Sequence, residues 1–457
     1  MNLEFWVVFW IGSLERGERL VKWKHLRSAI SSCALLSAVG LRAQVSLLTT
    51  VDQALRNSTA VRMAAADVQR AAAGVSEARD VYVPNFVLGS SVGYTYGFPI
   101  GQPTIVNVSS QSLIFTFSQR DYIRSARAAL NSAELSLADA RQQVVLDAAL
   151  DYIQLDTDQR RIEVLDQQNA SASKLAIIEQ QRLDAGVGTR EDVLRARLLS
   201  AQLRLKRLHI QDDIDLVRER LAHVTGLPAA SLVTETNSIP PSPDLQRSDP
   251  LAAKTSAMNT QSVRAAYANS LSHQYQAFGD ARQIYRPQIG FGGTYSRFSE
   301  INNYQEYYLR FQHNNFEAGL QITLPLFDAT RRAKENQSRA EALHATAQAD
   351  QLRDQSSENI VLLEKSLLEL NAQKEVAQLE DELAQSQLDA ILTQINSPGT
   401  QPGAAPLTPR EEQQARIEER RRFGEVIDAG FEMIKTELSL LRATGGIESW
   451  YKTLSHP

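Results

Sequence analysis

The chain reads ARDVYVPN at residues 78–85 and ARQIYRPQ at residues 281–288, 203 positions later. In both places an Ala-rich, helix-like stretch leads into the motif, and a strand-like alternation follows it. The same flanks around the same motif indicate two copies of one unit. Solenoid modules recur every 20–50 residues or so, and this repeat is far longer. The sequence therefore predicts a molecule with internal pseudo-symmetry, which is a common way to build a pore.

The first 43 residues resemble an export signal. Basic residues precede the apolar run 29–40, and Leu41-Arg42-Ala43 looks like a signal-peptide cleavage site. Residues 1–20 then read as a spurious upstream extension. Cys33, the only cysteine, matches a lipid-attachment pattern as an alternative, although very little apolar length precedes it. We predict an exported chain of residues 44–457, which would contain no disulfide and no thiolate metal site.

The pattern of residues 44–228 predicts helix, strand, strand, helix and helix in that order. The helix-like segments are 51–82, about 120–183 and a return segment that ends near 224; the strand-like segments are 86–96 and 107–117. The second helix would span ~95 Å. The return helix carries a coiled-coil stripe with spacing 4-3-4-3, made of Ile210, Ile214, Val217, Leu221 and Val224.

A Ser/Pro-rich linker, residues 229–249, separates this unit from a second copy at residues 250–457 with the same order of elements. The fold class is thus mainly α, with a duplicated unit and four short strands. No segment after the signal approaches the ~20 apolar residues of a membrane helix. Any membrane span must therefore be β.

The fourth predicted strand alternates most clearly. Apolar residues occupy the even positions from 316 to 326, whereas Glu317, Gln321 and Thr323 stand at odd positions. Lipid on one face and water on the other explains this pattern, and the three polar residues are candidate lumen-facing positions. A half-buried strand of a soluble domain is the alternative. Four such strands cannot close a membrane barrel, for which eight is the practical minimum, so this reading requires an oligomer.

No enzyme signature stands out. Residues 89–93 match G-x-S-x-G around Ser91, but a nucleophile elbow needs a sharp turn into a helix, and here the strand pattern continues. The seven histidines form no metal-binding motif, and no phosphate-binding loop is present. The net charge of −5 does not suggest a nucleic-acid partner. We therefore predict no catalytic residues, no cofactor and no metal.

The two helical turns carry similar polar residues. Thr189 and Thr408 each precede a helix with acidic residues in its first turn, which is the usual chemistry of an N-cap. In an oligomer the same acids would also ring a narrow end, where acidic rings select cations and hold a gate. The candidate gate residues are Arg190, Glu191, Asp192, Arg410, Glu411 and Glu412, with Asp192 and Glu411 preferred.

A cluster of aromatic residues lies between the third and fourth strands. It would form a girdle at the membrane interface or, alternatively, a packed loop. Its members are Tyr304, Tyr307, Tyr308 and Phe311.

As a set, these features resemble TolC-type outer-membrane efflux proteins over essentially the whole mature chain. The resemblance rests on Ala78-Arg79, on the strand start at 82–84, on the segment LPLFD at 324–328, on the tip RLDAGVGT at 182–189 and on LLRATGGIESW at 440–450. It implies a homotrimer in which each chain lends four strands to a 12-stranded barrel in the outer membrane. The helices would continue that barrel as a long periplasmic tunnel.

The resemblance also implies partners and a role. Such proteins are passive exit ducts that dock at their helical tips with a periplasmic adaptor and an inner-membrane pump, and they export small molecules or polypeptides. The candidate adaptor-docking residues are Gly186, Val187, Gly188 and Thr189. The second tip departs from the family through a Pro/Gly-rich insertion after Ile395. A periplasmic coiled-coil scaffold or adaptor without a pore is the alternative function.

Overall fold

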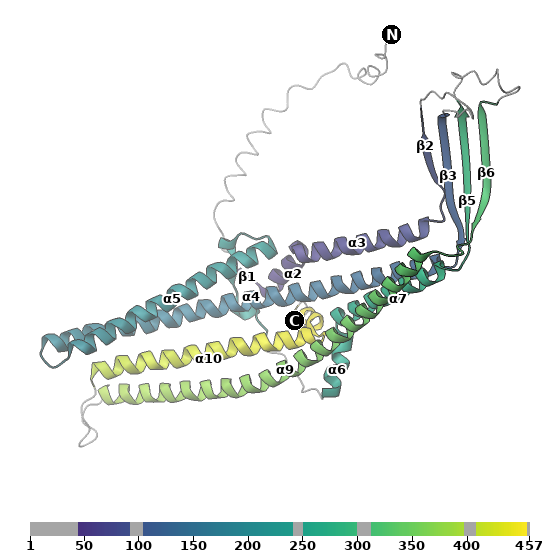
Figure 1. Cartoon of the computed structure of the whole chain (residues 1–457). Coiled ribbons are helices and arrows are strands. Elements are labelled where there is room, and N and C mark those ends of the chain that lie inside the picture. Colours follow the sequence, from purple (N-terminus) through teal and green to yellow (C-terminus); the bar gives the residue numbers. More distant parts are fainter. Residues whose placement is uncertain (1–43, 92–103, 241–249, 299–311, 397–407, 455–457) are drawn as a thin grey trace, which may run out of the picture.

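The computed structural model describes residues 44–91, 104–240, 250–298, 312–396 and 408–454. The predicted export signal with Cys33, the aromatic residues at 304–311 and most of the insertion after Ile395 lie outside these ranges. Within them, a four-stranded sheet extends from one end of a group of long helices, and the helical hairpins turn back at the opposite end (Figure 1). The element order confirms the duplicated helix–strand–strand–helix–helix unit.

The first repeat contributes, in chain order, β1 (Gln44–Val45), α2 (Leu47–Asn57), α3 (Thr59–Asp80), β2 (Asn85–Gly89), β3 (Thr104–Thr116), α4 (Gln119–Asp184) and α5 (Arg190–Thr225). A connecting segment follows, with short helical turns η1 (Ala229–Ser231) and η2 (Thr236–Ser238) around β4 (Val233–Thr234). The second repeat contributes α6 (Pro250–Asn259), α7 (Gln261–Gln283), β5 (Gln288–Phe298), β6 (Asn314–Thr323), α9 (Ala329–Asn396), α10 (Pro409–Ala443) and α11 (Ile447–Leu454).

The first predicted helix is divided in two. Residues 51–82 were expected to be continuous, but α2 ends at Asn57 and α3 begins at Thr59, with Ser58 between them in an extended conformation. Asn57 Nδ2 donates to the carbonyl of Thr225 at 2.5 Å, which ties the end of α2 to the end of α5. The second repeat breaks in the same way at Thr260, between α6 and α7.

The helices lie side by side, and the long α4 and α9 run through both the part near the sheet and the part near the hairpin ends. Near the sheet the neighbours run α3–α4–α7–α9, and toward the hairpin ends they run α5–α4–α10–α9. The predicted stripe on α5 is confirmed, because Ile214, Val217 and Leu221 are buried in one cluster with Leu155 of α4. No helix among the described residues is both long enough and apolar enough to cross a bilayer.

Part of the predicted linker is built into the fold. β4 pairs in parallel with β1, so that Gln44 lies opposite Val233. The Tyr152 hydroxyl accepts the Glu235 amide N–H at 2.7 Å and lies 2.8 Å from the Val45 carbonyl oxygen. Residues 229–240 thus fasten the start of the described chain to α4, rather than acting as a free connection.

The sheet has the strand order β2-β3-β5-β6, with all pairs antiparallel. The two repeats meet at the β3–β5 pair in its centre. Its two edges are β2 from the first repeat and β6 from the second.

Candidate functional site

The sheet separates polar from apolar side chains as the alternation predicted. Residues directly opposite in an antiparallel pair share a face. On one face Phe316 pairs with Tyr295 and Leu320 with Phe291, and on the other Glu317 pairs with Thr294. Asn107, Ser109 and Gln111 of β3 extend the polar face, because Ser109 pairs with Thr294.

The apolar face is open to the surroundings in the single chain. Phe86, Leu88, Phe316, Leu320 and Ile322 are each at least 69% exposed. Such a face needs an apolar environment, because contiguous apolar patches of this size are rare on soluble monomers. Glu317, Gln321 and Thr323 lie on the opposite, polar face. At the other edge of the sheet, just after β2, Ser90 Oγ donates to the carbonyl of Ile105 of β3 at 2.7 Å.

The first helical turn is fixed by its glycines. Gly186 has φ +73°, and the amide groups of Val187 and Gly188 both donate to the carbonyl of Arg182 at 3.0 Å. A Cβ on Gly188 would lie 2.9 Å from the backbone nitrogen of Leu183, so only glycine fits there. Val187 is 68% exposed at the apex. The turn therefore presents a rigid, exposed end.

Both tip helices begin with a threonine cap. Thr189 Oγ1 accepts the Asp192 amide N–H at 3.1 Å and donates to Asp192 Oδ2 at 2.6 Å. In the second hairpin the Thr408 amide N–H donates to Glu411 Oε2 at 2.7 Å, and Pro409 opens the helix. Thr189 and Thr408 therefore both cap the helices that follow them, as their spacing predicts.

One arginine joins three helices behind these caps. Arg410 of α10 lies with Nε 2.8 Å from Glu179 Oε1 of α4, and with Nη2 3.8 Å from Asp192 Oδ1 of α5. Arg182 Nε lies 3.6 Å from the other Glu179 oxygen. The Glu179 side chain is 3% exposed. These contacts are ion pairs and not aligned hydrogen bonds, because Arg410 Nε has no partner of hydrogen-bond geometry among the described residues.

Hydrogen bonds from the capping threonines, helped by nearby arginines, favour the ionised forms of Asp192 and Glu411. The hydrogen bond from Thr189 lowers the pKa of Asp192, and Arg410 adds to that effect. The backbone hydrogen bond from Thr408 lowers the pKa of Glu411, with smaller contributions from Arg410 and Arg182. The carboxylates of Asp192 and Glu411 therefore stay ionised into mildly acidic conditions.

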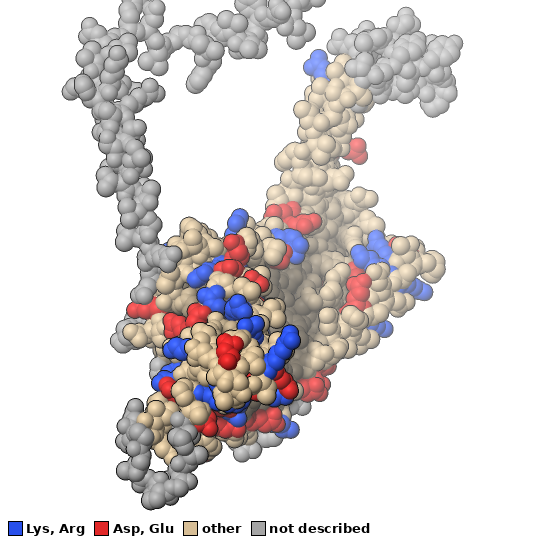
Figure 2. All heavy atoms as spheres, turned by 90° about the vertical axis from the view of Figure 1, so that its left-hand side faces the viewer, with Lys and Arg blue, Asp and Glu red and all other residues tan. Residues whose placement is uncertain are grey.

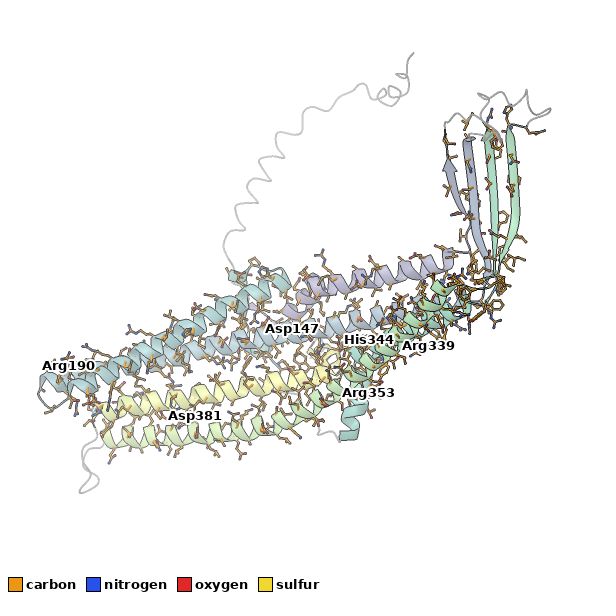
Figure 3. All side chains as sticks on the ribbon, viewed as in Figure 1. Asp147, Arg190, Arg339, His344, Arg353 and Asp381 are labelled. Atoms are coloured by element: carbon orange, nitrogen blue, oxygen red, sulfur yellow. The ribbon has the colours of Figure 1, made fainter. Side chains whose placement is uncertain are left out.

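The structure brings together only some of the predicted gate residues. Glu191 pairs with Arg195 at 2.5 Å and Glu412 with Arg416 at 2.9 Å, both along their own helices. Arg190 lies at the far end of the hairpin (Figure 3). Glu179 was not predicted, because a single acid inside a long helical pattern carries no signal of its own. It is the buried centre of the cluster Glu179, Arg182, Asp192 and Arg410, which we call the tip cluster.

Basic and acidic side chains intermingle over the helical end that faces the viewer in Figure 2, whereas the sheet behind it shows few charges. Among the residues that the structure describes, no three His, Cys, Asp or Glu side chains form a group that could hold a metal ion. The described residues thus present two candidate sites: the two-faced sheet at one end, and the exposed turn with its ion pairs at the other.

Known proteins share this architecture. The family model described as "Outer membrane efflux protein" matches residues 50–227. No curated protein sequence gives a significant match. Among solved structures, the Campylobacter jejuni CmeC outer membrane channel is 14% identical, with a TM-score of 0.71 over 90% of this chain and 89% of that one.

Two further structures agree with this fold. The outer membrane protein VceC from Vibrio cholerae is 18% identical, with a TM-score of 0.68 over 88% of this chain and 96% of that one. The MtrE outer membrane channel of Neisseria gonorrhoeae, solved in its open state, is 16% identical, with a TM-score of 0.62 over 88% and 89% of the two chains. At these identities the likeness concerns the fold. The first repeat thus matches the outer membrane efflux protein family model, and both repeats share the fold of these outer-membrane channels.

Proposed function

We propose that the chain is a passive outer-membrane channel of a tripartite efflux or type I secretion system. The observation that carries this proposal is the two-faced sheet joined to helices of 66 and 68 residues. At 1.5 Å per residue each helix is about 100 Å long, enough to cross much of a periplasm. Three copies would supply twelve strands, with the apolar face toward lipid and the polar face around a water-filled lumen.

The helical end is the proposed docking site for a periplasmic adaptor, which would link the channel to an inner-membrane pump. The rigid turn Gly186–Thr189 offers an exposed, shape-defined apex for that contact. The energy for transport would come from the pump, because no nucleotide-binding motif occurs in the sequence. A scaffold without a pore is less favoured, since it leaves the exposed apolar face of the sheet without a role.

The tip cluster is the proposed latch of the periplasmic gate. It holds α4 and α5 of the first hairpin to α10 of the second through Arg410. Opening would require these helices to separate and the cluster to break. The open state solved for the MtrE channel is consistent with such a movement in a protein of this fold.

Planar-bilayer conductance of the purified protein, combined with cell fractionation, tests this function. We expect the protein in the outer-membrane fraction, heat-modifiable trimers and single-channel steps. A periplasmic protein without conductance would overturn the proposal. Arg410→Ala should raise the conductance or the open fraction, whereas the matched variant Arg416→Ala, which breaks only a pair within α10, should not. Asp192→Ala and Glu411→Ala should change cation selectivity; unchanged channels would remove both from the gate.

A further inference from the structure

A groove runs between α5 and α10, with α4 as its floor. Toward the hairpin ends α5 and α10 both pack against α4, one on each side of it (Figure 1). The groove has a volume of about 250 Å³. Its lining positions recur every three or four residues along each helix, so one face of each helix borders it.

A missing side chain opens this groove. Gly424 lies inside α10, where glycine is less favourable than any other residue except proline. A Cβ on Gly424 would meet only Val164 Cγ1 of α4, at 3.8 Å, which is an ordinary contact distance. The position thus has room for a side chain, and none fills it. Space remains between α10 and the floor of the groove.

The floor and the walls are largely apolar. Val164 and Leu165 of α4 are 6% and 4% exposed. Leu199 and Leu203 of α5 and Ile417 of α10 are only half-buried, and all three line the groove. An alkyl chain in the groove would cover apolar surface that the protein itself leaves partly open, which favours binding.

One polar side chain of the floor has no partner. Gln168 lines the groove and is 5% exposed. Its amide forms no hydrogen bond with any residue that the structure describes. Polar groups buried to this extent are normally hydrogen-bonded. A ligand with a hydrogen-bonding head group would supply the missing partner.

The charges that line the groove cancel, apart from one lysine. Arg161 Nε donates to Asp428 Oδ1 at 2.5 Å. Arg421 Nη1 donates to Glu425 Oε1 at 2.7 Å. Lys206 of α5 is exposed and forms no ion pair with the part of the chain that the structure describes. The groove therefore carries one net positive charge, on its α5 wall.

This lysine and the unpartnered amide lie at nearly the same level of the groove. Arg207, next to Lys206, lies with Nε 2.7 Å from Oδ1 of Asp166, two residues before Gln168. Two residues of a helix span about 3 Å along its axis. A single small head group can therefore meet both the ammonium group and the amide.

We propose that this groove binds an amphiphilic organic monoanion, of which an alkyl carboxylate is the simplest example. The head group pairs with Lys206 and accepts a hydrogen bond from Gln168. The alkyl tail lies over Val164 and Leu165, in the space beside Gly424. The ligand thus contacts α4, α5 and α10 together.

The position of the groove gives the ligand an effect on the gate. The groove lies on the same three helices as the tip cluster, in which Arg410 of α10 already faces Asp192 of α5. A ligand between α5 and α10 joins them a second time. Bound anion therefore favours the closed state, a consequence that rests on the proposed channel function.

Calorimetric titration with octanoate tests the site. The channel is held in lipid nanodiscs, and empty nanodiscs give the blank for partition into lipid. We expect one saturable site per chain, which binds octanol, the uncharged analogue, several-fold more weakly. Affinity should rise about fourfold per CH₂ from hexanoate to octanoate. Uptake no greater than that of empty nanodiscs would overturn the inference.

Two pairs of variants test the head group and the tail separately. Lys206→Glu should reverse the preference from octanoate to octylammonium, whereas Lys174→Glu should not, because Lys174 is exposed but does not line the groove. Gly424→Leu should fill the groove and remove binding. The control Gly430→Leu, whose new Cβ has no atom within 4 Å, should bind as the wild type does.

Two results with these variants would contradict the site. An equal change of preference in both glutamate variants would show that overall charge, and not Lys206, selects the anion. Gly424→Leu that loses the periplasmic adaptor but keeps its affinity for octanoate would make the groove a protein docking surface instead.

Single-channel recording tests the effect on the gate. Saturating octanoate should lower the open fraction of the wild type and offset the rise expected for Arg410→Ala. Lys206→Glu channels in the same bilayers should not respond, which excludes an effect through the lipid. Binding with an unchanged open fraction would overturn the gating consequence. A protein that binds octanoate at this site but never conducts would overturn the channel proposal and leave the site standing.

Discussion

The Tyr152 hydroxyl illustrates how single polar groups position whole segments of this protein. The side chain is buried in α4, and its oxygen contacts the backbone of Val45 and Glu235 as well as Ser238 Oγ. Three segments distant in sequence thus meet at one atom. Burial raises the pKa of Tyr152, so the hydroxyl keeps its proton and can donate as well as accept.

Removing that hydroxyl should therefore destabilise the place where α4 holds the start of the described chain and the segment 229–240. Tyr152→Phe leaves the Glu235 amide N–H without its acceptor at 2.7 Å. We expect a loss of about 1–3 kcal/mol in unfolding free energy, the usual cost of leaving a buried polar group unpaired. Denaturant unfolding of the wild type and the variant measures it. Coincident curves would show that water replaces the hydroxyl without cost.

Asp151 should make stability depend on pH. Burial raises its pKa to about 6, and Arg220, at 3.2 Å, offsets only part of that effect. The folded state therefore binds this proton more tightly than the unfolded chain does. The ionised carboxylate costs at most about 3 kcal/mol above pH 6, and the cost is relieved as the pH falls from 6 toward 4.

Asp151→Asn should accordingly be more stable than the wild type at pH 7.5, and the difference should shrink at pH 5. Thermal unfolding of both proteins at the two pH values provides the measurement. A difference that grows at pH 5 would reverse the sign of the argument.

At the scale of elements, the sequence predicted what local periodicity controls. The bounds of α4 and α5, the buried stripe on α5 and the repetition of the unit were all anticipated. The break at Ser58 was not, because it depends on the contact between Asn57 and Thr225, 168 residues apart. The structure of residues 229–240 was also missed, since Pro and Ser are equally common in free linkers and in segments held by partners such as Tyr152.

In the candidate site, too, features set by local sequence were predicted and features set by distant contacts were not. The threonine caps at Thr189 and Thr408 follow from local spacing and are present. Glu179 could not be foreseen, because its role comes from Arg410, which lies more than two hundred residues along the chain. Expectations for the export signal and for the aromatic loop concern residues outside the described ranges and stay predictions.

The contact between α4 and α7 should be sensitive to one added methyl group. A Cβ on Gly279 would lie 2.6 Å from Cε1 of Tyr122, whose hydroxyl is held by Asp280. We expect Gly279→Ala to cost about 1–3 kcal/mol through overpacking. The control Gly430→Ala in α10 has no atom within 4 Å of the new Cβ and should gain up to about 1 kcal/mol from helix propensity. Equal unfolding free energies for both variants would contradict a tight α4–α7 contact.

At the scale of the molecule, the two faces of the sheet should respond differently to charge. Leu320 lies on the apolar face opposite Phe291, and its neighbour Gln321 lies on the polar face opposite Gly290. Leu320→Arg should cost about 2–4 kcal/mol if the apolar face contacts the membrane interior, whereas Gln321→Arg should assemble normally. The yield of heat-modifiable oligomer in outer membranes measures this. Equal yields would mean that the apolar face does not meet lipid.

The first and last helices of the described chain, α2 and α11, are buried in one hydrophobic cluster with the middle of α4. Leu47 of α2 and Ile447 and Trp450 of α11 are buried there together. The membrane sheet and the helical tip are thus made wholly from internal segments. A fluorescent protein or affinity tag joined after α11 would start from this cluster, away from both the sheet and the proposed docking turn. Exchange of the turn at Gly186–Thr189, by contrast, would leave the anchoring of α2 and α11 unchanged.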